Sequence, residues 1–239
     1  MFSLFSHNHY LADLLDGFRD IHCHLLPAVD DGSPDVEHSL KLVDTMSDLG
    51  VRAVYMTPHL ISGAYGNISP AELRSRFSEL RYDGNVDLRL AAEYFVDDRF
   101  LAKLYEDPLT MTDRHILVEF SLNGYSINSF DMLFEANMSG FQIILAHPER
   151  YSFVRFDAPD KVVNLIRQYD LQLNLLSIGG FYGNKCRKLA LRMLEEKLYT
   201  FIATDTHSIA YLDALKQYKV SNKIFDALRG LARNNDMLF

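Results

Sequence analysis

The chain has 239 residues, and its 48% content of hydrophobic residues is enough for a sizeable core. A net charge of -8 and a pI near 5.5 oppose binding to polyanions, so we expect no nucleic-acid partner. Two cysteines are too few for a disulfide framework or a cysteine-ligated zinc site, and no apolar run approaches the roughly 18 residues of a membrane span. The sequence therefore predicts a cytoplasmic protein without a transmembrane segment.

Short apolar segments alternate with segments of helical periodicity along the whole chain. The predicted strands are residues 18–22, 51–57, 86–94, 115–121, 141–147, 171–177 and 199–205. The predicted helices are residues 33–50, 69–80, 97–106, 127–140, 158–170, 184–197 and 208–218. Because no linker rich in Pro, Gly or Ser interrupts this order, we expect one α/β domain over residues 18–239, preceded by an N-terminal arm of residues 1–17.

Most of the predicted strands are apolar on both faces, as in a parallel sheet that helices cover on its outer side. A closed or nearly closed barrel is the preferred interpretation, and an open doubly wound sheet is the alternative. The difference matters because a barrel brings the carboxyl ends of all its strands to one mouth.

Polar side chains end six of the seven predicted strands. They are His22 and His24, His59, Glu93, Glu119, His147, and Asp205 with His207. Imidazole and carboxylate groups are ligands for first-row divalent metals. Burying so many of them in one mouth without cations would be costly, so the pattern predicts a metal site.

In the segment around His22 and His24, the sequence also indicates which residues are candidate ligands and which pack into the core. Alternate residues of a strand share a face, so His22 and His24 point the same way and Cys23 points into the opposite layer. In the loop that follows, Asp30 and Asp31 precede Gly32, and a turn-forming role is the simpler interpretation of the pair. Asp31 is the better ligand candidate of the two.

A competing phosphatase signal is the Cys-x5-Arg spacing of Cys186 and Arg192. Cysteine-dependent chemistry needs a turn whose backbone N–H groups hold the phosphate. Residues 184–197 are instead a glycine-free helical stretch, whose amides are used within the helix. We interpret the spacing as a coincidence.

Six short motifs of the sequence resemble those of a known family. The segments "DIHCHLLPAVDDG", "TPHL", "AAEY", "VEF", "AHPERY" and "TDTH" are similar to the motifs of polymerase-and-histidinol-phosphatase (PHP) domains. The similarity is to the branch of bacterial tyrosine-protein phosphatases linked to capsular and exopolysaccharide synthesis, and it runs from about residue 20 to about residue 215.

The resemblance implies a distorted (β/α)7 barrel of the PHP type with a trinuclear metal centre. It assigns His22, His24, Glu93 and Asp205 to one metal; Glu93, Glu119 and His147 to a second; and Asp31, His59 and His207 to a third. It further implies two or three divalent transition-metal ions, with Mn²⁺ as the first expectation and Fe, Zn, Mg or Co as alternatives.

Arg150 matches a family arginine that binds the substrate phosphate, and its planar guanidinium suits that contact. An ion pair with Glu149 or with the barrel rim is the alternative. The family's second arginine, after the last Asp-x-His motif, is missing here, and Lys216 or a rim tyrosine could replace it. His207 is the second catalytic candidate, because a site histidine can help the leaving group to depart.

The function that the resemblance implies is that of a metal-dependent protein-tyrosine phosphatase, in which a hydroxide bridging the metals attacks phosphotyrosine. The expected partner is a phosphotyrosine protein, such as the tail of the tyrosine kinase of a polysaccharide export system, with any membrane contact made through that kinase. Alternatives are a phosphatase for a small phosphomonoester such as histidinol phosphate, a nuclease-like PHP domain, which the acidic charge disfavours, and a non-catalytic metal-binding module.

Overall fold

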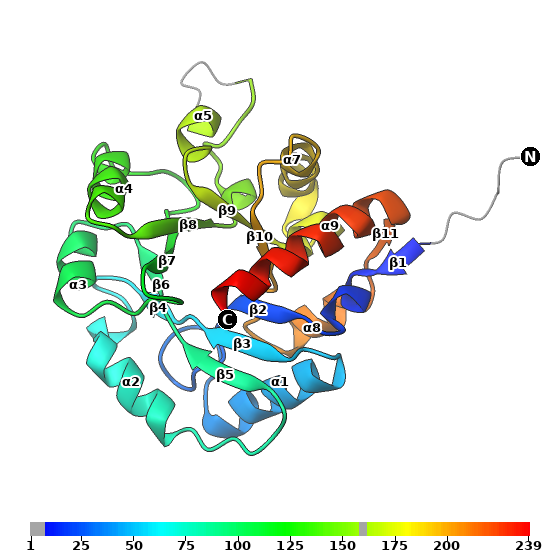
Figure 1. The fold of residues 1–239 in the computed structure, drawn as a ribbon, viewed down its shortest axis with the longest axis horizontal. Helices are drawn as coiled ribbons and strands as arrows, with labels where there is room; N and C mark the ends of the chain where they lie inside the picture. The colour runs from blue at the N-terminus through cyan, green and yellow to red at the C-terminus, as the bar shows by residue number, and fades with distance from the viewer. Residues whose placement is uncertain (1–7, 158–161) are drawn as a thin grey trace, which may run out of the picture.

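The computed structural model of the protein describes residues 8–157 and 162–239. Residues 1–7 of the predicted arm and residues 158–161 of the predicted helix 158–170 lie outside the described residues. The strands surround the centre of the molecule and most of the helices lie around them (Figure 1).

The strands form two parallel sheets and one antiparallel pair. They are β1 (Asn8–Tyr10), β2 (Arg19–Cys23), β3 (Ala53–Met56), β4 (His59–Leu60), β5 (Asp87–Leu90), β6 (Glu93–Phe95), β7 (His115–Glu119), β8 (Gln142–Ala146), β9 (Asp170–Asn174), β10 (Phe201–Ala203) and β11 (Lys219–Ser221). The six-stranded sheet has the order β10-β9-β8-β7-β6-β4, and the three-stranded sheet has the order β2-β3-β5. Strand β1 pairs with β11.

One edge of the three-stranded sheet continues into the six-stranded sheet. The chain passes directly from β3 to β4 and from β5 to β6, so the same two segments pair twice. Between the two pairings, Ala91 N donates to Met56 O over 3.0 Å, and Glu93 N donates to Pro58 O over 3.1 Å.

The other edge of the three-stranded sheet meets the far end of the six-stranded sheet. Asp205 N, just after β10, donates to His22 O of β2, and His24 N donates to Thr206 O, both over 2.9 Å. Hydrogen bonds therefore connect the two sheets on both sides, and those of this second connection involve residues that the sequence singles out as ligands.

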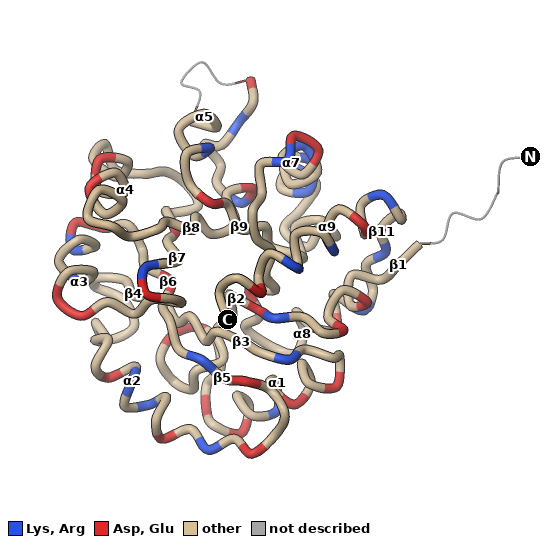
Figure 2. The backbone as a smooth tube through the Cα atoms, in the orientation of Figure 1, with Lys and Arg blue, Asp and Glu red and all other residues tan. Residues whose placement is uncertain are grey.

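Helices follow most of the strands. They are α1 (Val36–Asp48), α2 (Pro70–Glu79), α3 (Phe100–Glu106), α4 (Ser129–Met138), α5 (Val162–Ile166), α6 (Leu175–Gly179), α7 (Gly183–Glu195), α8 (Ile209–Leu215) and α9 (Asn222–Asn234). Side chains cap the starts of α1 and α2: Asp35 accepts from His38 N, and Ser69 accepts from Glu72 N. Acidic and basic positions are interspersed along these outer helices (Figure 2).

Two predicted strands are wrong in extent. Residues 86–94 form two strands, β5 and β6, which belong to different sheets. The predicted strand 171–177 ends at Asn174, whose side chain accepts a hydrogen bond from Leu176 N over 2.9 Å and so starts α6. No Gly or Pro marks either break, so the apolar pattern continues through both.

Several elements lie beyond the predicted strands and helices. Strands β1 and β11 pair at opposite ends of the chain, and α9 packs Phe225 and Leu228 into the core. Residues Leu11, Leu14 and Leu15, within the predicted arm, are also buried. The division between arm and domain at residues 17 and 18 stays a prediction. Among the described residues, none of the helices combines the length and apolar character needed to cross a membrane.

The buried apolar residues form two clusters on opposite faces of the strands. The larger cluster takes Val118, Ile143 and Leu145 together with residues of the helices. The smaller cluster takes the alternate strand residues Ile21, Tyr55, Leu117, Ile144, Ala146, Phe201 and Ala203, together with Ala91, Met111 and Leu238 from outside the strands. Since alternate residues point to opposite faces, the smaller cluster fills the inner side of the strands, away from the helices.

Candidate metal centre

All nine ligand candidates of the sequence lie together, most of them at or just after the carboxyl ends of parallel strands, with His59 and Glu93 at the starts of the short strands β4 and β6 and Asp31 in the loop after β2. They make up four overlapping groups: His24, Asp31, His59 and His207; His22, His24 and Glu93; His22, His147 and Asp205; and His59, Glu93 and Glu119. In each group the ligand atoms lie within 4.8 Å of one another. The predicted convergence of strand ends is therefore what the fold produces.

The most buried part of the centre contains two histidines and two carboxylates. His22 Nε2 lies 3.1 Å from His24 Nε2. Both nitrogens lie 3.3 Å from Glu93 Oε2 and 3.4 Å from Asp205 Oδ1. Donor atoms on a tetrahedron with bonds of about 2.1 Å are separated by about 3.4 Å, so these four side chains have the spacing of a metal site. They are also the set that the resemblance assigns to the first metal.

Glu93 connects this site to a second one. Its other oxygen, Oε1, lies 3.1 Å from His147 Nε2, and that nitrogen lies 3.9 Å from Glu119 Oε2. His59 Nδ1 lies 3.1 Å from Glu93 Oε2 and 3.0 Å from Glu119 Oε1. Among the described residues neither His59 Nδ1 nor Glu93 Oε2 has a partner with hydrogen-bond geometry. Buried polar atoms that converge without hydrogen bonds fit a cation between them.

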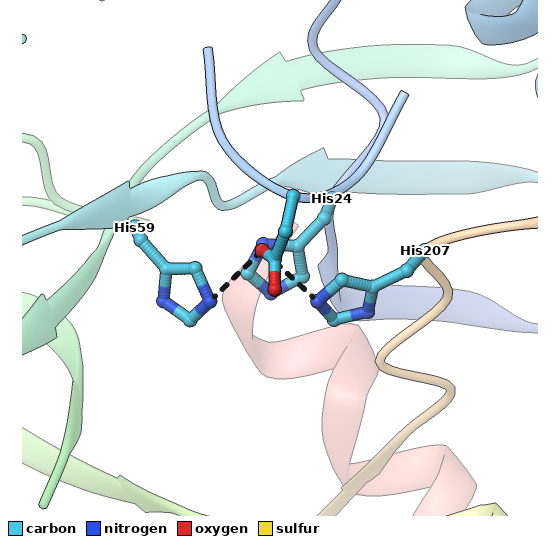
Figure 3. Close-up of side chains that lie close together, drawn as sticks. His24, His59 and His207 are labelled. Carbon is cyan, nitrogen blue, oxygen red and sulfur yellow. Dashed lines mark ion pairs between the residues drawn. The ribbon is translucent and has the colours of Figure 1, made fainter. Parts of the chain in front are cut away.

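The third set is the most open to solvent. Asp31 Oδ1 lies 3.5 Å from His59 Nε2 and 3.7 Å from His207 Nε2. Figure 3 shows the rings of His24, His59 and His207 turned toward one another around this position. The side chain of Asp31 is 55% exposed, whereas those of His22, His24 and Glu93 are 0% exposed.

Electrostatic interactions within the centre fix which groups carry charge. Burial opposes ionisation of Glu93, but the surrounding histidines hold its pKa well below 4.5. The same competition, with Arg150 added to the histidines, holds the pKa of Asp205 well below its usual value. Burial and the nearby His24 lower the pKa of His207 to about 4. Despite burial, the carboxylates raise the pKa of His24 and raise that of His59 to about 10, so a metal that binds there displaces protons from these two imidazoles.

Backbone strain marks the same strand ends. His147 and Asp205 have positive φ angles of 33° and 53°, in the left-handed region that residues other than glycine rarely adopt. Such conformations cost about 1–3 kcal/mol each and persist where the surrounding structure imposes them. At both positions the strain turns a candidate ligand toward the centre just after its strand ends.

A set of polar side chains orients the histidines by hydrogen bonds to the ring nitrogens that face away from the centre. His24 Nδ1 lies 2.8 Å from Asp30 Oδ2, and His22 Nδ1 lies 3.0 Å from Gln172 Oε1. His207 Nδ1 donates to the backbone oxygen of Asp205 over 2.8 Å. Contacts of this kind hold metal-binding histidines in one tautomer with Nε2 free to bind.

The two loop aspartates therefore have different roles: Asp30 positions His24, and Asp31 is a candidate ligand. Asp30 holds His24 and also accepts from Gly32 N over 2.9 Å, while Asp31 faces His59 and His207. A side chain at Gly32 would collide with the backbone of His24, since a Cβ there would lie 2.0 Å from His24 O. The Asp-Asp-Gly sequence therefore supplies a positioning residue, a ligand candidate and a close backbone contact in three consecutive positions.

Known proteins are similar to most of this chain. A family model described as "Capsular polysaccharide synthesis, CpsB/CapC" matches residues 18–213. The chain belongs to this family. The tyrosine-protein phosphatase YwqE of Bacillus subtilis (strain 168) is 28% identical over 198 residues, which cover 80% of this chain and 77% of that protein. The tyrosine-protein phosphatase CpsB of Streptococcus pneumoniae is 29% identical over 206 residues, covering 80% and 83% of the two chains.

Solved structures extend the similarity to the fold. A structure from work on YwqE of B. subtilis and CpsB of S. pneumoniae, described there as unique metal-dependent tyrosine phosphatases, superposes with a TM-score of 0.77 at 26% identity, over 92% of this chain and 93% of that one. The phosphotriesterase homology protein of Escherichia coli, at 11% identity, shares the fold with a TM-score of 0.51 over 91% and 98% of the two chains. The predicted resemblance to the capsular branch is confirmed.

In this CpsB/CapC chain, Arg150 lies at the edge of the centre. It follows β8 in a 3₁₀ turn (Pro148–Arg150), and its Nη1 donates to Asp205 Oδ2 over 2.6 Å. The guanidinium carbon lies 4.3 Å from the ring centroid of Tyr182, and 19% of the side chain is exposed. Arg150 is thus paired with a candidate ligand, and phosphate binding by Arg150 stays a prediction.

The alternative ion pair between Arg150 and Glu149 is not what the structure shows. The carboxylate of Glu149 is buried and accepts from Ser177 Oγ over 2.7 Å, from Tyr199 Oη over 3.0 Å and from Asn174 N over 3.0 Å. Burial raises the pKa of Glu149. Glu149 is therefore a structural residue beneath the site.

Among the described residues, Cys186 and Arg192 do not share a site. Cys186 is buried in α7, and burial raises its pKa to about 11. Arg192 is exposed and pairs with Glu196 over 2.6 Å. Cys23 is buried and donates to Tyr55 O over 3.2 Å, on the face opposite His22 and His24, as the alternation predicts. Thiols that strongly favour the protonated form are poor nucleophiles.

Two positioning residues escaped the sequence analysis. Gln172 holds His22, and Asn174 Nδ2 donates to Asp205 Oδ2 over 2.8 Å. Both lie on β9, the one predicted strand without a ligand at its end. The sequence contained a clue to both residues: two amides alternate with leucines in an otherwise apolar strand. Because a buried amide needs a hydrogen-bond partner, each could have been expected to contact a polar residue of the site.

Proposed function

We propose that this protein is a metal-dependent phosphatase that hydrolyses phosphotyrosine in a protein of a capsular or exopolysaccharide system. The observation that carries the proposal is the convergence of nine histidine and carboxylate side chains at the strand ends. The tyrosine-phosphatase names of the relatives support the substrate class. The tail of a bacterial tyrosine kinase is the partner that fits best, and we place the reaction in the cytoplasm.

We infer that the two parallel sheets form a distorted (β/α)7 barrel. The hydrogen bonds that join β2 to the end of β10, and those that join β5 and β6 to β3 and β4, support a closed ring over an open doubly wound sheet. A ring explains why side chains from all these strands reach one mouth. Residues 18–239 then act as one domain.

The donor set favours two or three divalent transition-metal ions. Imidazole and carboxylate ligands without thiolates suit Mn²⁺, and also Fe, Zn, Co or Mg. His22, His24, Glu93 and Asp205 would hold the most buried ion, with Glu119, His147, Asp31, His59 and His207 completing the others. When bound, such ions stabilise the charge of the phosphoryl group and make water nucleophilic at neutral pH.

The protein's own residues define how substrate approaches. Asp31 has the most exposed side chain of the nine candidate ligands, whereas His22, His24 and Glu93 are fully buried, so we expect the phosphate to approach on the side of Asp31, His59 and His207. Arg150 pairs with Asp205 at the edge of the centre, and 19% of its side chain is exposed, which leaves room for a contact with a phosphate oxygen. The tyrosine phenolate is a tolerable leaving group, so modest proton donation is sufficient.

The hydrogen bond of His207 favours a ligand role over a proton-donor role. Its Nδ1–H donates to the Asp205 backbone oxygen, so Nε2 faces Asp31 without a proton. A histidine in this tautomer can bind a metal through Nε2 but has no proton to give there. The proton for the leaving group then comes from water at the exposed side.

The test combines metal analysis with a substrate panel. We expect purified protein to hold two or three ions per chain, to lose phosphatase activity on chelation and to regain it with Mn²⁺. Phosphotyrosine peptides should be hydrolysed with higher kcat/KM than histidinol phosphate. A preference for histidinol phosphate would move the substrate to the small phosphomonoester alternative, and metal binding without any turnover would favour the non-catalytic module.

A further inference from the structure

A cleft of about 690 Å³ opens between the first turns of α1 and α8, directly beside the metal centre. One end of it is lined by Asp31 and His207, two of the candidate ligands. The rest of its lining includes Pro34, Lys41, Leu42, Ile209, Ala210 and Tyr211. We name it the α1–α8 cleft.

The cleft lies next to the most exposed side of the candidate metal centre. Asp31 and His207 have side chains that are 55% and 14% exposed, so a phosphate that reaches the metals lies against them. The ring of Tyr65 stacks on His59, with centroids 5.6 Å apart and an angle of 5° between the planes, so it lies over one of the three residues of this exposed set. The α1–α8 cleft opens beside the other two, Asp31 and His207, and can take the group attached to the phosphate.

The residues that line the cleft suit an aromatic ring that carries a negatively charged group. Pro34, Leu42 and Ile209 supply apolar surface, and the ring of Tyr211 lies 5.3 Å from that of His207 and 5.2 Å from that of Phe181. Aromatic rings gain stabilisation from offset or edge contacts at such distances. Lys41 adds a cation to the lining, opposite in sign to a phosphate or an acidic peptide.

We propose that the α1–α8 cleft receives the phenyl ring of the phosphotyrosine substrate while its phosphate lies at Asp31, His59 and His207. The inference rests on the proposed function and adds to it the residues that select an aryl over an alkyl phosphate. The volume of the cleft falls in the range of small-molecule sites and leaves room for the flanking peptide.

A second cleft of about 480 Å³ lies between α2 and α3 and provides a matched control. None of the nine candidate ligands lines it. Ala71 is the second residue of α2 and Ala210 is the second residue of α8; both are exposed, and each lines its own cleft. Because both side chains are exposed, we expect a larger side chain at either position to destabilise the fold little.

The experiment fills each cleft in turn in metal-loaded protein. Ala210→Phe should weaken phenylphosphonate binding and raise KM for a phosphotyrosine peptide, each by about tenfold, because the added ring occupies the place of the substrate ring. Methylphosphonate binding and metal content should stay unchanged. Ala71→Phe should change none of these quantities, and Ala210→Leu should give an intermediate effect while making a smaller demand on folding.

The outcomes separate this inference from the proposed function. Equal weakening of phenylphosphonate and methylphosphonate in Ala210→Phe would mean that the cleft does not hold the ring, as would unchanged binding of both. If the wild-type protein binds phenylphosphonate through the cleft but hydrolyses no phosphotyrosine peptide, the aryl site stands and the proposed reaction fails.

Discussion

The two ends of the inner side of the strands differ in chemistry although the same strands build both. At one end Ala91, Leu117 and Ala203 belong to the small apolar cluster. Two residues further along the chain stand Glu93, which begins β6, Glu119, which ends β7, and Asp205, which follows β10, and all three are candidate ligands. In β7 the step from Leu117 to Glu119 advances the strand by about 7 Å and keeps the same face, so the apolar floor there lies directly under a candidate ligand.

This difference shows how the fold supports the centre. The floor consists of uncharged side chains without strain, whereas the ligand layer contains buried carboxylates, closely spaced imidazoles and the positive φ angles of His147 and Asp205. Each of these features costs folding free energy when no cation is bound. The floor should therefore control stability and the ligand layer should control metal binding and activity, and each prediction below tests that division.

Replacing Glu93 should have the largest effect on activity. Glu93 is fully buried, and its two oxygens face His22, His24, His59 and His147. In Glu93→Gln we expect at least about a 10³-fold loss of kcat/KM, or about 4 kcal/mol. Mass spectrometry of the native protein should show fewer bound ions per chain. Full metal content with wild-type kinetics would remove Glu93 from the centre.

Replacing Ile144 should lower stability but leave activity and metal content nearly unchanged, the opposite of what we expect for Glu93. Ile144 is buried in the floor, three residues before His147 along β8 and its end. Ile144→Ala should lower the free energy of unfolding by about 2–5 kcal/mol, since it leaves a cavity. Denaturant titration of the metal-loaded protein measures this, and kcat/KM of the folded variant should stay close to the wild-type value. A large loss of metal from folded Ile144→Ala would show that the two layers are not separable.

Removing Arg150 should affect substrate more than metal. We expect Arg150→Ala to lose about 10²-fold in kcat/KM, or about 3 kcal/mol, because a guanidinium gives charge-assisted hydrogen bonds to phosphate oxygens. Arg150→Lys should recover only part of the loss. Metal must be quantified in the same samples, since Arg150 also pairs with Asp205. Activity near the wild-type value in Arg150→Ala would assign this arginine to the structure of the rim alone.

Gln172 tests whether the positioning contacts matter. Its Oε1 holds His22 Nδ1 over 3.0 Å, and it touches no other candidate ligand through a hydrogen bond among the described residues. Gln172→Leu keeps the size of the side chain and removes the contact, so metal affinity should fall by about 10–100-fold. Activity should return at high metal concentration, which a purely structural defect would not allow.

The sequence was sufficient to predict which side chains come together, because most of the candidate ligands lie at or just after strand ends. An apolar run followed by His, Glu or Asp is visible without any tertiary information, and the alternation in His22, Cys23 and His24 assigns their faces. The break between β5 and β6 was not visible, because Ala91 and Ala92 continue the apolar pattern on both faces. The pairing of β1 with β11 joins residues more than 200 positions apart, so no local pattern can reveal it.

The smallest effect is expected for Cys186, and it separates two chemistries that share the name of tyrosine phosphatase. Burial raises the pKa of the Cys186 thiol to about 11, and the thiol donates to Ser177 Oγ over 3.5 Å within the packing of α6 and α7. At neutral pH almost none of it is thiolate, so it cannot act as the nucleophile. Cys186→Ser should therefore leave kcat/KM within about twofold of the wild-type value, a change of less than about 0.5 kcal/mol in transition-state stabilisation. The change in unfolding free energy should be modest, since the hydroxyl can keep the contact with Ser177. Steady-state kinetics with a phosphotyrosine peptide, run with and without a thiol-alkylating reagent and a chelator, measures how far the activity depends on a free thiol and on bound metal.

Activity that disappears on alkylation and survives chelation would transfer the catalytic role from the candidate ligands to Cys186 in α7.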